Sequence, residues 1–99
     1  MSSIINKELK ICKKKVRFLK ELAHPIRLYI VKRLIQNGSS NVTTIYKVLN
    51  MPQSTISQHL SKLKAAQIVI SERKGIEVYY EVKNELIIQL VSMLLESKH

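Results

Sequence analysis

The spacing of hydrophobic positions changes from a helical period to a strand period after residue 67. Before that point apolar residues recur every three or four positions in four stretches, and they do so again near the end of the chain: residues 4–23, 24–36, 43–49, 53–65 and 84–96. This spacing predicts five amphipathic helices. Residues 37–41, which include Gly38, predict a helix stop and a loop.

Residues 43–64 have the pattern of two short helices in succession. The break between them falls at Asn50, Met51 and Pro52. The inner side of the first helix is marked by Ile45, Val48 and Leu49. In the second helix, residues 53–65, a single apolar stripe is formed by Ile56, Leu60 and Leu63. Such helix pairs also occur in domains that bind no nucleic acid, so the polar face decides between the two readings.

The opposite face of the second helix is polar and free of carboxylates. It consists of Ser54, Gln58, Ser61 and Lys62, with Thr55 and Ser57 at its edges. A helix in a DNA major groove reaches bases and phosphates with Gln, Ser, Thr and Lys, whereas phosphates repel carboxylates. We therefore predict a helix-turn-helix in which residues 53–65 form the recognition helix.

A β-hairpin is predicted directly after the recognition helix. Its strands are residues 68–70 and 76–82, where Ile76, Val78, Tyr80 and Val82 alternate with polar or aromatic neighbours. The turn, residues 72–75, carries Arg73 and Lys74, and Gly75 supplies a positive φ. Cations at the tip of such a hairpin can reach phosphates. The element order predicts a mainly α (α+β) winged helix-turn-helix fold, with one domain over residues 1–99.

The first and last predicted helices have more apolar surface than one small domain covers. The first carries a narrow seam, which consists of Ile5, Leu9, Cys12, Val16, Leu19 and Ala23. In the last, eight of the ten residues 86–95 are apolar. A second copy of the chain is the simplest cover, so we predict a homodimer through these two helices. Such a dimer places two recognition helices about 34–36 Å apart, one turn of DNA.

The charge distribution favours a polyanionic partner. Lys and Arg number 17 against 7 acidic residues, a net charge of +10, and no acid lies between Glu21 and Glu72. We assign the positive field of that gap to DNA binding; its cations are Arg27, Lys32, Arg33, Lys47, Lys62 and Lys64. A single cysteine excludes an internal disulfide framework. With no apolar run near the roughly 20 residues of a membrane span, and no signal peptide, we expect a cytoplasmic protein without membrane contact.

Three motifs in this order resemble the ArsR/SmtB family of bacterial winged-helix repressors: LAHPIRL at residues 22–28, PQSTISQHL at 52–60 and the hairpin at 75–80. The resemblance implies a dimer joined by its terminal helices and repression by occupation of operator DNA. It implies four base-contacting residues, Gln53, Ser54, Ser57 and Gln58. We expect contacts to the DNA backbone from Thr43, Thr55, Lys62, Arg73 and Lys74.

Two departures concern metals. Metal-sensing members of the family carry a cysteine cluster in the helix before the recognition helix, and residues 43–49 offer no ligand. On the last helix, the spacing of Glu85, Glu96 and His99 fits no single face. We therefore expect no metal and no cofactor. Two further departures concern the ends of the recognition helix: Pro52 replaces a frequent Ser at its start, and Gln67 stands where Gly is common.

Other readings remain open. Lysines 13–15 would favour the reactive thiolate form of Cys12, so a redox- or metal-responsive repressor of the same fold is one alternative. His24 is predicted to be structural, and His59 to be packed or bonded to a phosphate rather than to a metal. A general RNA-binding or nucleoid module needs exposed aromatic residues, and the few aromatics fall on faces that look structural. With no Asp, no nucleophile elbow and no Gly-rich phosphate loop, an enzyme is not expected.

Overall fold

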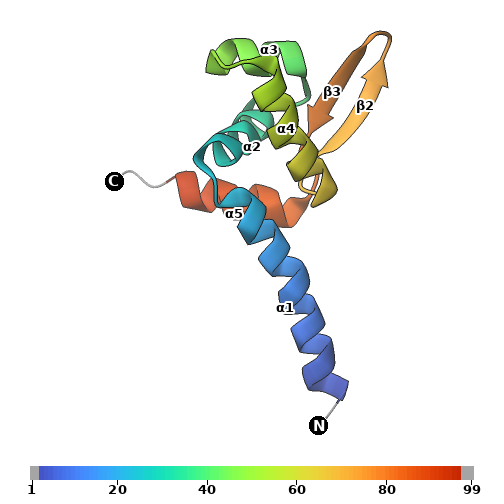
Figure 1. Ribbon diagram of the computed structural model, residues 1–99. Coiled ribbons are helices and arrows are strands. Elements are labelled where there is room, and N and C mark those ends of the chain that lie inside the picture. The colour runs from blue at the N-terminus through green and yellow to red at the C-terminus, as the bar shows by residue number, and fades with distance from the viewer. Residues whose placement is uncertain (1–2, 97–99) are drawn as a thin grey trace.

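The computed structural model describes residues 3–96, which form five helices and three short strands. In chain order these are α1 (Ser3–Leu22), α2 (Pro25–Asn37), β1 (Ser40–Asn41), α3 (Val42–Leu49), α4 (Gln53–Ala65), β2 (Ile70–Lys74), β3 (Glu77–Glu81) and α5 (Glu85–Leu95). Figure 1 shows α1 projecting from the body, with α3, α4 and the β2–β3 hairpin at the opposite end. The predicted winged helix-turn-helix fold is confirmed, and α4 has the predicted bounds.

The sheet has one strand more than predicted. β1 pairs antiparallel with β3, so the strand order is β1-β3-β2. The prediction of a loop was wrong for Ser40 and Asn41, because a strand of two residues is too short to produce an alternating pattern. Since β1 immediately precedes α3, the sheet attaches the β2–β3 hairpin to the start of the helix-turn-helix.

The hairpin turn is also shorter than predicted. Only Gly75 and Ile76 connect the strands, and residues 72–74 belong to β2. Gly75 has a φ of +66°, and glycine in the first position of a two-residue loop is typical of a type II′ turn. Ile76, predicted to begin the second strand, lies in the turn instead and is 93 % exposed. Ile68 and Val69 precede β2 rather than belonging to it, and both are buried in the core.

A single hydrophobic core joins the described helices. Its fully buried side chains include Ile30 and Val31 of α2, Ile56, Leu60 and Leu63 of α4, and Ile87 and Val91 of α5. The predicted apolar stripe of the recognition helix is therefore confirmed. On α3 Ile45 is buried and Leu49 half-buried, but Val48 is 47 % exposed, contrary to its predicted inner position.

Two non-glycine residues in the left-handed region lie at the ends of the helix-turn-helix helices. Asn50 (φ +53°) ends α3, and Gln67 (φ +63°) follows α4. Asn tolerates this conformation better than Gln does, since its short side chain hydrogen-bonds locally. Gln67, noted above as a departure at a position where Gly is common, therefore holds a strained backbone.

Replacing Gln67 with Gly is expected to raise the free energy of unfolding by about 1 kcal/mol, because glycine adopts a positive φ without a Cβ clash. Urea denaturation at a fixed protein concentration measures the change. The matched substitution Asn50→Gly should give a smaller gain. Equal effects of the two substitutions would contradict the strain assigned to Gln67.

Candidate nucleic-acid interface

The turn between α3 and α4 is formed by local backbone chemistry. The left-handed conformation of Asn50 ends α3, and its N–H donates to the carbonyl of Lys47 at 3.2 Å. Pro52 is the N-cap of α4, where its ring fixes φ at −57°, its backbone is still extended (ψ 143°), and it offers no side-chain cap. The sequence therefore orients α4 across α3 through two residues of restricted φ.

The outer face of α4 is polar, as predicted. Gln53, Ser54, Gln58, Ser61 and Lys62 are exposed, while Thr55 and Ser57 are half-buried at the edges. No carboxylate occurs in α4. The four predicted base-contacting residues lie on this one helix, although Ser57 sits closer to the body than the other three. Thr43, in the first turn of α3, is half-buried.

The two cations of the hairpin differ in their surroundings. Lys74 Nζ lies 4.0 Å from Glu72 Oε1 and 5.2 Å from the centroid of the Tyr79 ring. Arg73 is exposed and has no polar partner among the residues that the structure describes. Arg73 is therefore the cation of this pair that is freer to bind an external anion.

One side chain connects the hairpin to the helix-turn-helix. Asn41 Oδ1 accepts a hydrogen bond from the backbone N–H of Thr44 at 2.8 Å and so caps α3. The Nδ2 group of the same residue donates to Glu77 Oε2 on β3. Together with the β1–β3 pairing, this contact fixes the hairpin beside α3 and α4.

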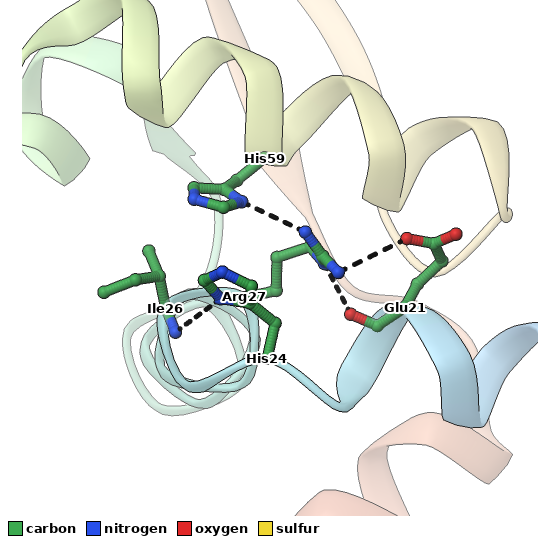
Figure 2. A network of polar contacts seen from close by, with 5 residues as sticks. All are labelled: Glu21, His24, Ile26, Arg27 and His59. Atoms are coloured by element: carbon green, nitrogen blue, oxygen red, sulfur yellow. Dashed lines mark hydrogen bonds and ion pairs between the residues drawn. The ribbon is translucent and has the colours of Figure 1, made fainter.

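A buried polar network behind α4 was not predicted. Arg27 is only 7 % exposed. Its Nε donates to the backbone carbonyl of Glu21 at 2.6 Å, Nη2 lies 3.6 Å from Glu21 Oε1, and Nη1 is 3.2 Å from His59 Nδ1. Figure 2 shows the guanidinium between α1 and α4. Arg27 therefore does not belong to the exposed positive field to which the sequence analysis assigned it.

The sequence did contain a signal for the burial of Arg27. It precedes Ile30, Val31 and Leu34 at intervals of three, four and seven residues, and all three are buried. A cation in line with an apolar helical stripe points to the core. Burial of an arginine requires polar partners. The identity of the partners, Glu21 on α1 and His59 on α4, cannot be predicted from the residues around Arg27 in the sequence.

The two histidines of this region both make contacts within the protein. His24 Nδ1 accepts from the N–H of Ile26 at 3.1 Å and caps α2. The ring centroids of His24 and His59 are 4.6 Å apart, with the planes tilted by 52°. Burial lowers the pKa of His59 below 6.5, and the neighbouring His24, Arg27 and Lys62 lower it further.

Within residues 3–96 no group of three or more His, Cys, Asp or Glu side chains could hold a metal ion. His99, considered above with Glu85 and Glu96, lies outside the described residues. Cys12 is exposed on α1, and its role as a redox thiol stays a prediction. In the described part of the chain no helix is long and apolar enough to cross a membrane.

The aromatic residues do not form a stacking platform. Phe18 is buried, and Tyr29, Tyr46, Tyr79 and Tyr80 are half-buried, so none of the five is fully open to solvent. Single-stranded nucleic acids are bound mainly by exposed aromatic faces. The geometry therefore favours a duplex partner over single-stranded RNA.

Together, a recognition-type helix with a polar, carboxylate-free face and an adjacent hairpin define a winged helix-turn-helix transcriptional regulator. Residues 24–71 match the model of a family described as "Bacterial regulatory protein, arsR family". The chain is 41 % identical over 76 residues to the transcriptional repressor PagR of Bacillus anthracis, a match that covers 77 % of this chain and 76 % of PagR. The chain belongs to the ArsR family.

Solved structures agree with this assignment. The crystal structure of PagR superposes with a TM-score of 0.81 at 36 % identity, covering 87 % of this chain and 98 % of that one. The solution structure of a homodimeric winged helix-turn-helix DNA-binding domain from Mycobacterium bovis, Mb0332, gives a TM-score of 0.82 at 28 % identity, covering 95 % and 83 %.

Proposed function

We propose that this protein is a transcriptional repressor that occupies palindromic operator DNA as a homodimer, with α4 in the major groove and the β2–β3 hairpin on the backbone. The observation that carries the proposal is the exposed, carboxylate-free face of α4, which is supported from behind by three fully buried side chains. Because a repressor acts on the chromosome, we also propose that the protein is cytoplasmic.

The proposed contacts divide by chemistry. Gln53 and Gln58 carry an amide that can donate to and accept from one adenine, and the hydroxyls of Ser54 and Ser57 can bond to bases or phosphates. Thr43, Thr55, Lys62, Arg73 and Lys74 are assigned to the DNA backbone. The Asn41 contact to Glu77 supports this assignment, because it holds the hairpin and the helices in one rigid unit.

The uncovered surface of α1 supports the dimer. In α1 only Phe18 and Leu22 are buried. Leu9, Val16 and Leu19 of the apolar seam are between 53 % and 55 % exposed. A helix that leaves such a seam in water has a partner outside its own protomer.

A groove beside this seam continues onto α5. It has a volume of about 270 Å³, and its lining is apolar: Leu19, Leu22 and Ala23 of α1, Leu28 of α2, and Leu90, Val91 and Leu94 of α5. Beyond it, Met93 is 77 % exposed. The α1 and α5 helices of a second copy have the apolar residues to fill the groove, and the structure of Mb0332 is described as homodimeric.

Selection of duplexes from a random-sequence library tests the function directly. We expect enriched duplexes to contain two inverted half-sites about 10–10.5 base pairs apart, or a multiple of that spacing. Affinity measured by fluorescence anisotropy at two salt concentrations then separates specific from non-specific binding. Equal affinity for all duplexes would overturn the proposal.

The hairpin cations should control the salt dependence of binding. Arg73→Ala is expected to reduce the slope of log K against log salt by about one, since each phosphate contact releases about one counterion. Lys74→Ala should have a smaller effect, because Lys74 already has Glu72 and Tyr79 as neighbours. Lys10→Ala removes the same charge from α1 and serves as the control. An unchanged slope in the double variant Arg73→Ala, Lys74→Ala would remove the hairpin from the proposed interface.

A further inference from the structure

We infer that Arg27 and His59 are positioning residues: the contact between Arg27 Nη1 and His59 Nδ1 sets the orientation of α4 in which its outer face reads DNA, and it requires the neutral form of His59. The inference rests on the proposed function. Within residues 3–96, this is the one side-chain hydrogen bond that joins α4 to another helix or strand. The other contacts of α4 are apolar packing, the ring contact between His24 and His59, and backbone hydrogen bonds from residues 68 and 69 to the carbonyl of Leu63.

Apolar packing holds α4 against the core, and a hydrogen bond adds a directional constraint on its rotation. Ile56, Leu60 and Leu63 hold the helix against the core, but the hydrophobic effect has no preferred direction. A hydrogen bond has both a preferred distance and a preferred angle. His59 lies at the edge of the apolar stripe, next in sequence to Gln58. A contact at His59 therefore determines which way the outer face of the helix points.

Arg27 is itself held in place from the other side. Glu21 accepts from the guanidinium through its backbone carbonyl at 2.6 Å, and its carboxylate lies 3.6 Å away. Figure 2 shows Arg27 between Glu21 and His59. The guanidinium can only donate hydrogen bonds and stays charged at all relevant pH values. His59 Nδ1 must therefore accept, which a protonated imidazole cannot do.

Protonation of His59 removes the contact and adds repulsion. The groups that face its ring are His24, which caps α2, Arg27 of α2 and Lys62 of α4, while the single nearby carboxylate, that of Glu21, is on the far side of Arg27. A protonated His59 and Arg27 are both positively charged donors, so they repel each other and move apart. The lowered pKa of His59 agrees with this, because burial and the neighbouring cations both disfavour the protonated ring. The contact is fully present above pH 6.5, the ordinary value for His59, and is lost as the pH falls through the lowered value.

The test compares the protein with two matched variants. In His59→Asn the amide oxygen can stand where Nδ1 stood, but it does not titrate. In His24→Asn the helix cap is retained, since Asn is a good N-cap residue, and the imidazole of His24 is removed. The affinity for the duplex selected above is divided by the affinity for a random duplex of equal length, between pH 8 and pH 5.5.

In the wild-type protein and in His24→Asn, this ratio should fall about tenfold on acidification, the size of one lost hydrogen bond to a charged group. It should stay level in His59→Asn. Random-duplex affinity serves as the internal control, because added positive charge strengthens it at low pH. A ratio that falls equally in His59→Asn would overturn the inference.

A measurement without DNA separates this inference from the proposed function. In ¹H–¹⁵N NMR spectra of the free protein, the amide shifts of Gln58 and Ser61 should follow the titration of the His59 ring. The same shifts should be absent in His59→Asn. If the amide shifts of Gln58 and Ser61 do not change as His59 titrates, the inference is overturned. Equal affinity for all duplexes would instead overturn only the proposed function.

Discussion

The variant Leu94→Glu is expected to be a folded monomer that binds a two-half-site operator between about 10² and 10⁴ times more weakly than the wild-type protein. Leu94 lines the apolar groove between α1 and α5 and is 59 % exposed in the single chain. A carboxylate there stays in water in the monomer. In the proposed dimer it would be buried without a partner, which costs several kcal/mol. Dissociation leaves one recognition helix per particle and removes the linked binding of two half-sites.

Sedimentation equilibrium and anisotropy measure the two parts of this result. The control is Ile70→Glu, which places the same charge at a residue of similar exposure (46 %) on β2. It should leave the protein dimeric. Circular dichroism confirms that each variant is folded. A dimeric Leu94→Glu protein would move the proposed interface away from the α1–α5 groove.

Gln58→Ala has the second large expected effect. Gln58 is exposed near the middle of the outer face of α4. A glutamine amide that bonds to a base in the major groove contributes about 1–3 kcal/mol to discrimination. The variant should therefore lose that amount of binding free energy on the selected duplex and accept more bases at one position. Its affinity for random DNA should not change, because no charge is removed.

The comparison is made by anisotropy with both duplexes at one salt concentration. Gln36→Ala, which removes the same exposed group from the end of α2, is the matched control and should bind as the wild type does. Equal losses on the selected and the random duplex would show that Gln58 reads no base.

The helices and the two faces of α4 could be predicted because they depend on the order of neighbouring residues along the chain. A side chain's place on a helix follows from its position in the sequence, so helical periodicity alone predicts both the buried set, Ile56, Leu60 and Leu63, and the exposed Gln58. The hairpin was predicted for the same reason. Its turn was predicted at residues 72–75 and consists of Gly75 and Ile76, because the charged residues 72–74 belong to an edge strand, where charged side chains are common.

The sequence alone thus determined the five helices, the recognition helix with its polar face, the hairpin and the excess of apolar surface on the first and last helices. Only the tertiary structure decided that β1 exists, that Arg27 is buried against Glu21 and His59, that Asn41 bonds to Glu77, and that Arg73 is freer than Lys74. The physical reason is separation along the chain. Arg27 and His59 are 32 residues apart, and Asn41 and Glu77 are 36. Periodicity assigns a residue to a face, but only packing brings a particular donor to a particular acceptor.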